Sequence, residues 1–200
     1  MKTSGTLPIH LTTPLTDAAV AELKAGDRVL LSGEIYTARD AAHKRLVETL
    51  AAGEILPFDL VGQVIYYVGP APARPGQVIG PAGPTTSARM DPYTPILLEH
   101  GLKGMVGKGR RNAVVRQACV DHRAVYLVAV GGAAALISQQ IIASTPVAYE
   151  DLGTESIKCL TVEDMPLIVA NDIHNGDLYE QGAAAYRNEK VLKELMGEND

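Results

Sequence analysis

The chain has 200 residues, of which 46% are hydrophobic and 20% charged, and its formal net charge is -5. This composition predicts a folded core and argues against disorder, while the acidic balance argues against a general nucleic-acid surface. Cys119 and Cys159 form no CxxC pair and no disulfide framework, which favours a cytoplasmic protein. The longest apolar stretch, 124–142, is interrupted by glycine, serine and glutamine, so we expect no membrane span.

Hydrophobic periodicity and turn signals predict the elements in chain order. Strands are expected at 9–15, 28–32, 60–68, 77–79, 103–109, 124–130, 146–149, 157–162 and 165–170. Helices are expected at 17–24, 40–52, 93–100, 112–120, 133–141 and 182–196. Because strands alternate with helices and then cluster late, we expect an α/β fold. We expect residues 1–200 to form a single domain with a mixed central sheet flanked by helices.

The segment Gly80–Met90 carries the clearest local signal for function. Its prolines and glycines disfavour regular structure, and it lies between an expected strand and an expected helix. Thr85, Thr86 and Ser87 place hydroxyls at this junction, where backbone N–H groups favour an anion. We therefore hypothesise that the loop binds a small carboxylate and supplies a reacting hydroxyl. The alternative is a proline-rich turn capped by Ser and Thr side chains.

Three cations recur where expected strands end, namely Arg39, Arg89 and Lys108. The ends of strands that lead into helices are the usual place for active-site residues in α/β folds. Together these side chains would suit a dicarboxylate, since arginine binds carboxylates through paired hydrogen bonds. The alternative is that each is an ordinary surface charge. Thr85 would need strong activation to act as a base, and the scattered histidines indicate no metal site in this chain.

Five segments resemble, in order, the signatures of the iron–sulfur hydro-lyase C-terminal family. They are Gly33–Arg45, Gly80–Met90, Lys103–Gly109, Ala129–Ala135 and Asp151–Ser156. This family comprises the class I fumarate hydratases and L-tartrate dehydratases, and the chain resembles the separate β subunit. The resemblance implies a swivelling β/β/α domain.

The resemblance also implies a partner and roles for four residues. A partner α subunit would hold a 4Fe-4S cluster, whose open iron would act as a Lewis acid on the substrate. By motif position, Arg39, Arg89 and Lys108 would bind the dicarboxylate. Thr85 would be the catalytic base that takes the C3 proton of malate, together with an acid from the partner.

The leading hypothesis is therefore the reversible hydration of fumarate to (S)-malate by a hetero-oligomer, with α2β2 as one arrangement. The alternative within the same enzyme class is dehydration of L-tartrate or hydration of mesaconate. An alternative of another class is a subunit that only binds a dicarboxylate or stabilises its partner. Many family members have Met where this chain has Thr154 in the fifth signature.

Overall fold

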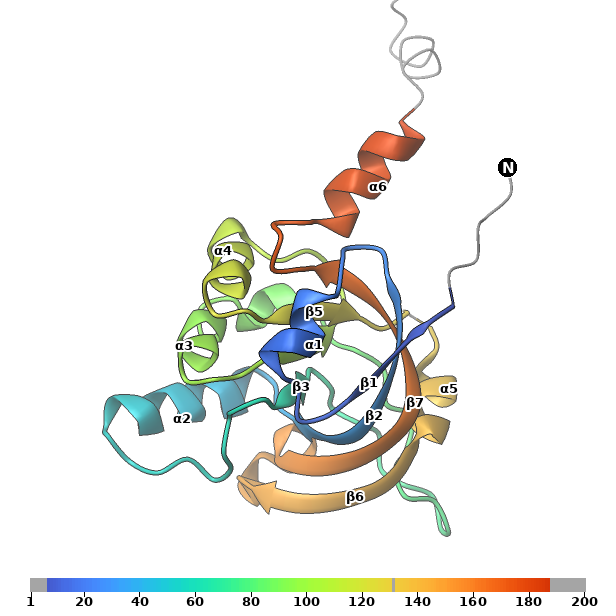
Figure 1. The fold of residues 1–200 in the computed structure, drawn as a ribbon. Coiled ribbons are helices and arrows are strands. Elements are labelled where there is room, and N and C mark those ends of the chain that lie inside the picture. The colour runs from blue at the N-terminus through green and yellow to red at the C-terminus, as the bar shows by residue number, and fades with distance from the viewer. Residues whose placement is uncertain (1–6, 131, 188–200) are drawn as a thin grey trace, which may run out of the picture.

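The computed structural model describes residues 7–130 and 132–187, and in them a mixed sheet is flanked by helices (Figure 1). The strand order is β1-β2-β3-β4-β5-β7-β6, so the α/β fold with a mixed central sheet is confirmed. The strands are β1 (Ile9–Thr12), β2 (Arg28–Thr37), β3 (Val64–Tyr66), β4 (Gly104–Gly107), β5 (Val125–Val128), β6 (Ile141–Ala148) and β7 (Ile157–Asn171). The α-helices are α1 (Asp17–Ala21), α2 (Asp40–Ala51), α3 (Thr94–Glu99), α4 (Ala113–Asp121), α5 (Ala134–Ile137) and α6 (Leu178–Tyr186). Short 3-10 helices are η1 (Ser87–Met90), η2 (Ser138–Gln140) and η3 (Glu150–Glu155).

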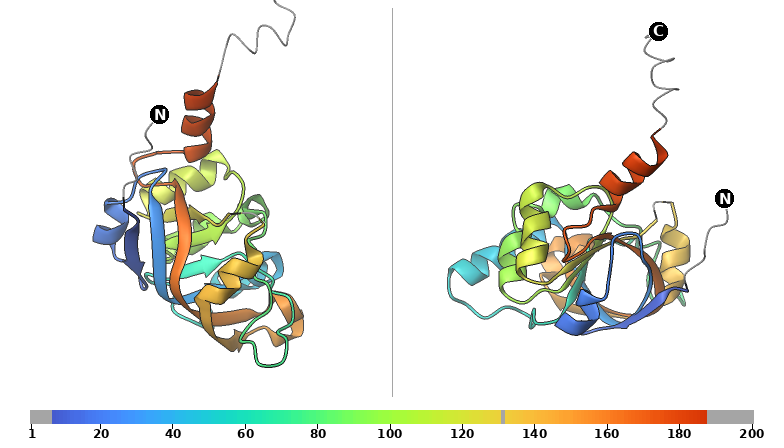
Figure 2. Two further views of the ribbon diagram at one scale, coloured as in Figure 1. Left: turned by 90° about the vertical axis from the view of Figure 1, so that its right-hand side faces the viewer. Right: turned by 45° about the horizontal axis from the view of Figure 1, so that its top comes forward.

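The strand pairings close the sheet on itself. Strands β1 to β5 pair in parallel from neighbour to neighbour, and β7 runs antiparallel to β2, β5 and β6. The pairings β2–β3, β3–β4, β4–β5, β5–β7 and β7–β2 therefore return to the starting strand, and the right-hand view of Figure 2 shows this ring. Because β2 to β5 are parallel, their carboxyl ends meet at one edge of the sheet.

Residues alternate along the strands between two hydrophobic cores. Tyr66 and Val106 belong to the core shared with α1 and α5, whereas Tyr67, Met105 and Tyr126 belong to the core under α2, α3 and α4. This period of two is the pattern of strands whose two faces are both covered. The sheet is therefore fixed from both sides, and the chain segments that leave its carboxyl edge start from rigid positions.

The structure corrects three of the expected strands and one expected helix. Residues 77–79 form no strand, because this segment lies within a Pro- and Gly-rich loop where Gly80 packs against the backbone of Ala71. The strands expected at 157–162 and 165–170 are one strand, β7, in which Asp164 adopts a φ of 48°. The helix expected at 133–141 ends at Ile137, because Ile141 already belongs to β6.

The expected C-terminal helix begins earlier than its sequence pattern predicts. Asp177 caps α6 by accepting hydrogen bonds from the backbone N–H groups of Tyr179 and Glu180. Helix α6 extends away from the body of the protein in Figure 1, and residues 188–196 of the expected helix lie outside the described part of the chain. Within residues 7–130 and 132–187, the structure holds no helix that is long and apolar enough to span a bilayer.

Candidate active site

Arg39 follows the end of β2 by two residues and is the N-cap residue of α2. Its side chain is 20% exposed, and its Nη2 lies 3.2 Å from Glu155 Oε1. A Cβ on Gly69 would lie 2.6 Å from Arg39 Nη1, so a larger residue at position 69 would displace this guanidinium. The buried Nε of Arg39 has no hydrogen-bond partner in the described residues, so this guanidinium keeps an unused donor.

Asp40 brings Arg39 and Arg89 together. Arg89 Nη2 donates a hydrogen bond to Asp40 Oδ2, and Arg39 Nη2 lies 4.0 Å from the same oxygen. Asp40 is in the first turn of α2, where the helix dipole stabilises a carboxylate. Two of the three expected cations thus share one carboxylate, although 50 residues separate them in the sequence.

Thr85 and Lys108 are joined through their backbones at the ends of β3 and β4. Thr85 N–H donates to Tyr67 O at 2.7 Å, and Lys108 N–H donates to Thr85 O at 3.2 Å. Ser87 N–H then donates to Lys108 O at 2.9 Å, which continues the pairing by one residue. Thr85 is half-buried and Lys108 is exposed. The loop therefore extends the parallel sheet by a short bridge in which Thr86 is paired with Lys108 and flanked by Thr85 and Ser87.

The three hydroxyls of the loop have different surroundings. Ser87 is buried, and its Oγ lies 2.8 Å from the hydroxyl of Tyr126. A Cβ on Gly107 would overlap Ser87 Oγ, so this contact requires the glycine. Thr86 is exposed and precedes η1, the 3-10 helix that carries Arg89. Of the three, Ser87 anchors the loop, Thr86 is the bridge partner of Lys108, and Thr85 is the half-buried hydroxyl between Pro84 and Thr86.

Arg111 is a buried side chain that links several elements of the site through hydrogen bonds. Its Nε donates to Asp91 Oδ1 at 2.6 Å, and the two side chains are 0% and 6% exposed. Its remaining nitrogens contact Tyr67 Oη at 3.3 Å and Thr94 Oγ1 at 2.7 Å. The guanidinium carbon also lies 5.0 Å from the ring centroid of Tyr126, within cation–π range. Arg111 thereby connects β3, η1, α3 and β5.

Burial and charge act in opposite directions on Arg111. Desolvation by itself would lower the pKa of the guanidinium, but the neighbouring Tyr67 and Asp91 raise that pKa above its ordinary value. The residue therefore stays charged inside the protein. Arg111 belongs to the basic stretch 107–111, whose composition is typical of an exposed surface and gives no sign of burial. The one sequence signal for a buried cation was the presence of Tyr67 and Tyr126 in two apolar strand segments, because their hydroxyls need hydrogen-bond partners inside the protein.

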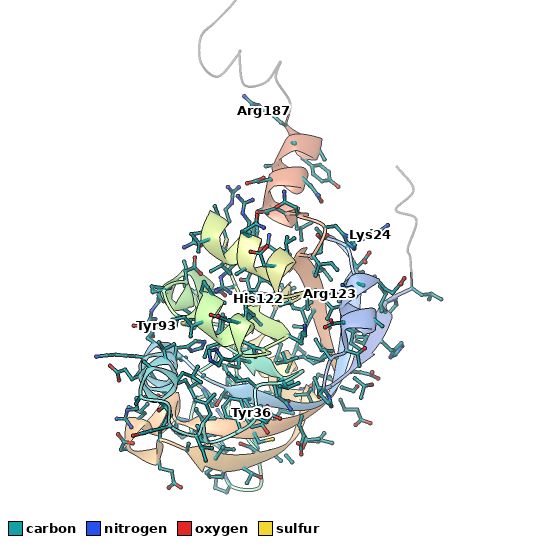
Figure 3. All side chains as sticks on the ribbon, turned by 60° about the vertical axis from the view of Figure 1, so that its left-hand side comes forward. Lys24, Tyr36, Tyr93, His122, Arg123 and Arg187 are labelled. Carbon is teal, nitrogen blue, oxygen red and sulfur yellow. The ribbon has the colours of Figure 1, made fainter. Side chains whose placement is uncertain are left out.

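His43 is a buried and uncharged histidine under the start of α2. Its Nδ1 lies 2.9 Å from Arg39 O, so Nδ1 carries the proton and donates it to that carbonyl. The ring packs edge-on against Tyr67 at 5.2 Å, and Tyr93, labelled in Figure 3, lies 6.3 Å away between ring centroids. Burial lowers the pKa of His43 to about 4. His43 thus holds the backbone of Arg39 in place without adding a charge.

The residues of this chain do not fit an iron–sulfur cluster, which is bound through several cysteine thiolates. Cys119 is fully buried on α4, where burial raises the pKa of its thiol to about 12, and Cys159 lies on β7. Among the residues described, no group of three or more His, Cys, Asp or Glu side chains is placed to hold a metal ion.

Fold and site together define an α/β protein that gathers cations at the carboxyl edge of a parallel sheet, a class suited to acidic ligands. Residues 1–182 match the family model described as "Fumarase C-terminus". The chain belongs to the fumarase C-terminal family.

Two of the similar proteins are much longer than this chain. The chain is 38% identical over 177 residues to "Fumarate hydratase class I, anaerobic" of Escherichia coli, a match that covers 86% of this chain and 32% of the relative. It is 36% identical over 167 residues to "Fumarate hydratase 2" of Leishmania major, which covers 82% and 29% of the two chains. It therefore spans about a third of the length of these two enzymes.

A third relative is similar over its whole length. The chain is 39% identical over 192 residues to a Methanocaldococcus jannaschii protein that carries the provisional name L(+)-tartrate dehydratase subunit beta. This match covers 92% of the present chain and 96% of the relative.

We expect the Arg111→Met variant to lose roughly 3–5 kcal/mol of unfolding free energy, because it leaves the Asp91 carboxylate buried without its counter-ion. The double variant Arg111→Met, Asp91→Asn should recover part of this loss, since the buried charge is gone while residue 91 can still accept from Asn112 N–H. Urea unfolding followed by circular dichroism measures both values. Arg45→Met, which breaks the exposed pair with Asp151, is the control and should change stability little. A similar small change in Arg111→Met would contradict the role given to Arg111.

We expect stability to fall as the pH is lowered from about 6.5 to about 4, because the unfolded chain binds a proton on His43 that the folded chain excludes. The loss should approach about 3 kcal/mol, the size set by the shift in the pKa of His43. His43→Gln should remove this part of the pH dependence of urea unfolding.

His100 provides the matched control for His43. Its Nδ1 makes the same contact with a carbonyl four residues earlier, 2.8 Å from Ile96 O, but the side chain is exposed. His100→Gln should therefore keep the full pH dependence. An unchanged slope in His43→Gln would show that other groups cause the acid sensitivity.

Proposed function

We propose that this chain is the β subunit of a two-subunit hydro-lyase that hydrates fumarate reversibly to (S)-malate. The observation that carries the proposal is the meeting of Arg39 and Arg89 at the single carboxylate of Asp40. Two guanidiniums that converge on one carboxylate of their own chain are also placed to bind a carboxylate of a substrate. Similarity to fumarate hydratases and to the tartrate dehydratase subunit supports the reaction class.

In this proposal the cations bind the two carboxylates of the substrate. The side chains of Arg39 and Arg89 are 20% and 49% exposed, so both guanidiniums present surface to a ligand at the edge of the sheet. Lys108 is exposed next to Thr85 and would add a third positive charge. Cations from three separate segments would fix the orientation of the substrate as well as its charge.

Thr85 would hold and move a proton at its Oγ. In the dehydration direction, its deprotonated oxygen takes the proton from C3 of malate. The C3–H electrons then form the double bond, and the C2 hydroxyl leaves as water after it receives a proton from an acid of the partner. The neighbouring cations would favour the deprotonated form of Thr85, which is otherwise a weak base.

The electrophile would come from a partner α subunit, because this chain lacks the ligands for a cluster. We propose that the partner holds a 4Fe-4S cluster, which would supply a Lewis acid at the substrate hydroxyl. We further propose that residues 1–200 act as one domain within a hetero-oligomer, for which α2β2 is one arrangement. The cytoplasmic location expected from the cysteines stays a prediction.

The substrate alternatives remain L-tartrate and mesaconate, and the similarity to the tartrate dehydratase subunit favours tartrate as the second candidate. A subunit that binds a dicarboxylate without catalysis is the alternative of another class. The half-buried hydroxyl of Thr85 supports a catalytic subunit over that alternative, because binding alone would need only the cations.

Reconstitution with the partner tests the function. We expect the chain alone to be inactive, and the pair made with the α subunit of the same source to convert fumarate faster than tartrate or mesaconate. Thr85→Ala should lower kcat of the pair by roughly 10²–10⁴, the usual contribution of a general base, while dicarboxylate binding persists. Absorbance of the fumarate double bond measures turnover, and calorimetry measures binding.

Thr86→Ala is the matched control, because Thr86 is the exposed neighbour of Thr85 and carries the same hydroxyl. This variant should keep most of the activity. Substantial kcat in the Thr85→Ala pair would refute the assignment of the base. Activity of the purified chain without iron would refute the need for a partner.

We expect Arg89→Lys to raise KM about tenfold with a smaller change in kcat, because an ammonium cannot make the two parallel bonds of a guanidinium to a carboxylate. Steady-state kinetics of the pair measure both constants. Arg123→Lys is the control, since Arg123 pairs with Asp17 at the far end of α4 (labelled in Figure 3) and should leave KM unchanged. An unchanged KM in Arg89→Lys would remove Arg89 from the site.

A further inference from the structure

A pocket of about 210 Å³ lies between the proline-rich loop after β3 and the start of β7. Lys158 and Ser144 line it from the sheet, and Thr154 lines it from η3. The opposite wall is apolar and includes Val78 and Ile79. This volume is enough for a small organic molecule, and the proposed chemistry at Thr85 does not use the pocket.

Lys158 is a partly buried cation without a counter-ion. No carboxylate in the described residues lies within 4.0 Å of its nitrogen. Its Nζ donates to Ser156 Oγ at 2.6 Å and approaches Gly153 O at 3.5 Å. Two of the three N–H donors of Lys158 therefore bind the end of η3. The third donor is left for a ligand.

The environment of Lys158 disfavours an unpaired charge. Burial lowers the pKa of its ammonium group, because no nearby anion compensates for the lost hydration. The nearest acidic residue along the chain, Glu155, is already held by Arg39 at 3.2 Å. An anion in the pocket would restore the balance of charge, and the Ser144 and Thr154 hydroxyls on its wall could donate to the same anion.

The apolar wall of the pocket indicates which group the ligand carries besides its negative charge. Val78 is 49% exposed, which is high for a large aliphatic side chain, and it forms part of the pocket with Ile79. A short aliphatic chain would cover this surface and gain the free energy of removing it from water. Neither inorganic phosphate nor a second charged group would do so.

We propose that this pocket is a binding site for a small aliphatic monocarboxylate, with the carboxylate on Lys158 and the aliphatic chain on Val78 and Ile79. The site goes beyond the proposed hydro-lyase function and does not depend on it. It is nevertheless connected to Arg39, since Thr154 lines the pocket while the next residue, Glu155, contacts the Arg39 guanidinium. The backbone of η3 is thus shared by the pocket and by one of the cations of the candidate active site.

Titration of the full chain with butyrate, followed by the backbone amide signals of Gly153 and Thr154 in NMR spectra, tests the proposal. Butyrate should shift both signals to saturation, whereas butylammonium, which has the same shape and the opposite charge, should not. Lys158→Met should weaken butyrate binding about tenfold or more, the usual loss for a hydrogen bond to a charged group. Lys158→Arg should retain binding.

Two further variants keep the test decisive if Lys158→Met fails to fold. Val78→Asp places a negative charge on the exposed apolar wall and should also weaken butyrate binding. Lys24→Met removes an exposed lysine (labelled in Figure 3) and should have no effect.

Three results would overturn the proposal. The first is the absence of saturable shifts with butyrate, and the second is equal binding of butylammonium. The third is binding that is lost in Lys108→Met but kept in Lys158→Met, which would place butyrate in the candidate active site. Because the titration needs neither the partner nor turnover, failure of the hydro-lyase proposal would leave these results unchanged.

Discussion

The ion pair between Arg111 and Asp91 is the interaction on which the geometry of the candidate site depends. It is fully buried, so its two charges must face each other, and any displacement of one leaves the other without water or a partner. Asp91 directly follows η1, which carries Arg89, and Arg111 follows β4 and Lys108 by only a few residues. The pair therefore fixes the distance between two segments whose exposed cations are proposed to bind the substrate. Specificity of position, rather than net stability, is the role that suits a buried pair of this kind.

The exposed side of the site is balanced by acids of its own chain. Asp40 is shared by Arg39 and Arg89, and Glu155 holds Arg39 from the other side. Arginine charges that are already compensated do not repel one another, so they can remain close in the absence of a ligand. In the proposed function, binding of a substrate carboxylate would exchange one acidic partner of these arginines for another.

Much of the fold could be predicted from the sequence, because the apolar strands and the capped helices carry local signals. The capping hydroxyl of Thr16 and the continuous apolar run from Val64 to Val68 are examples of such signals. The role of Asp40 could not be predicted, since it depends on the approach of Arg89 from a distant segment. Burial of Arg111 was missed for the same reason, as the tyrosines that surround it come from different strands.

Strand β7 has a consequence for how this protein is made. It pairs with β2, β5 and β6, and its residues 157–171 are near the end of the described chain. A growing polypeptide therefore leaves the edge of β2 that faces β7 unpaired until residues 157–171 have been translated. The ring can close only after β7 has emerged, and such long-range pairing slows folding. A product truncated before β7 would leave unpaired edges on β2, β5 and β6, and such edges are templates for aggregation.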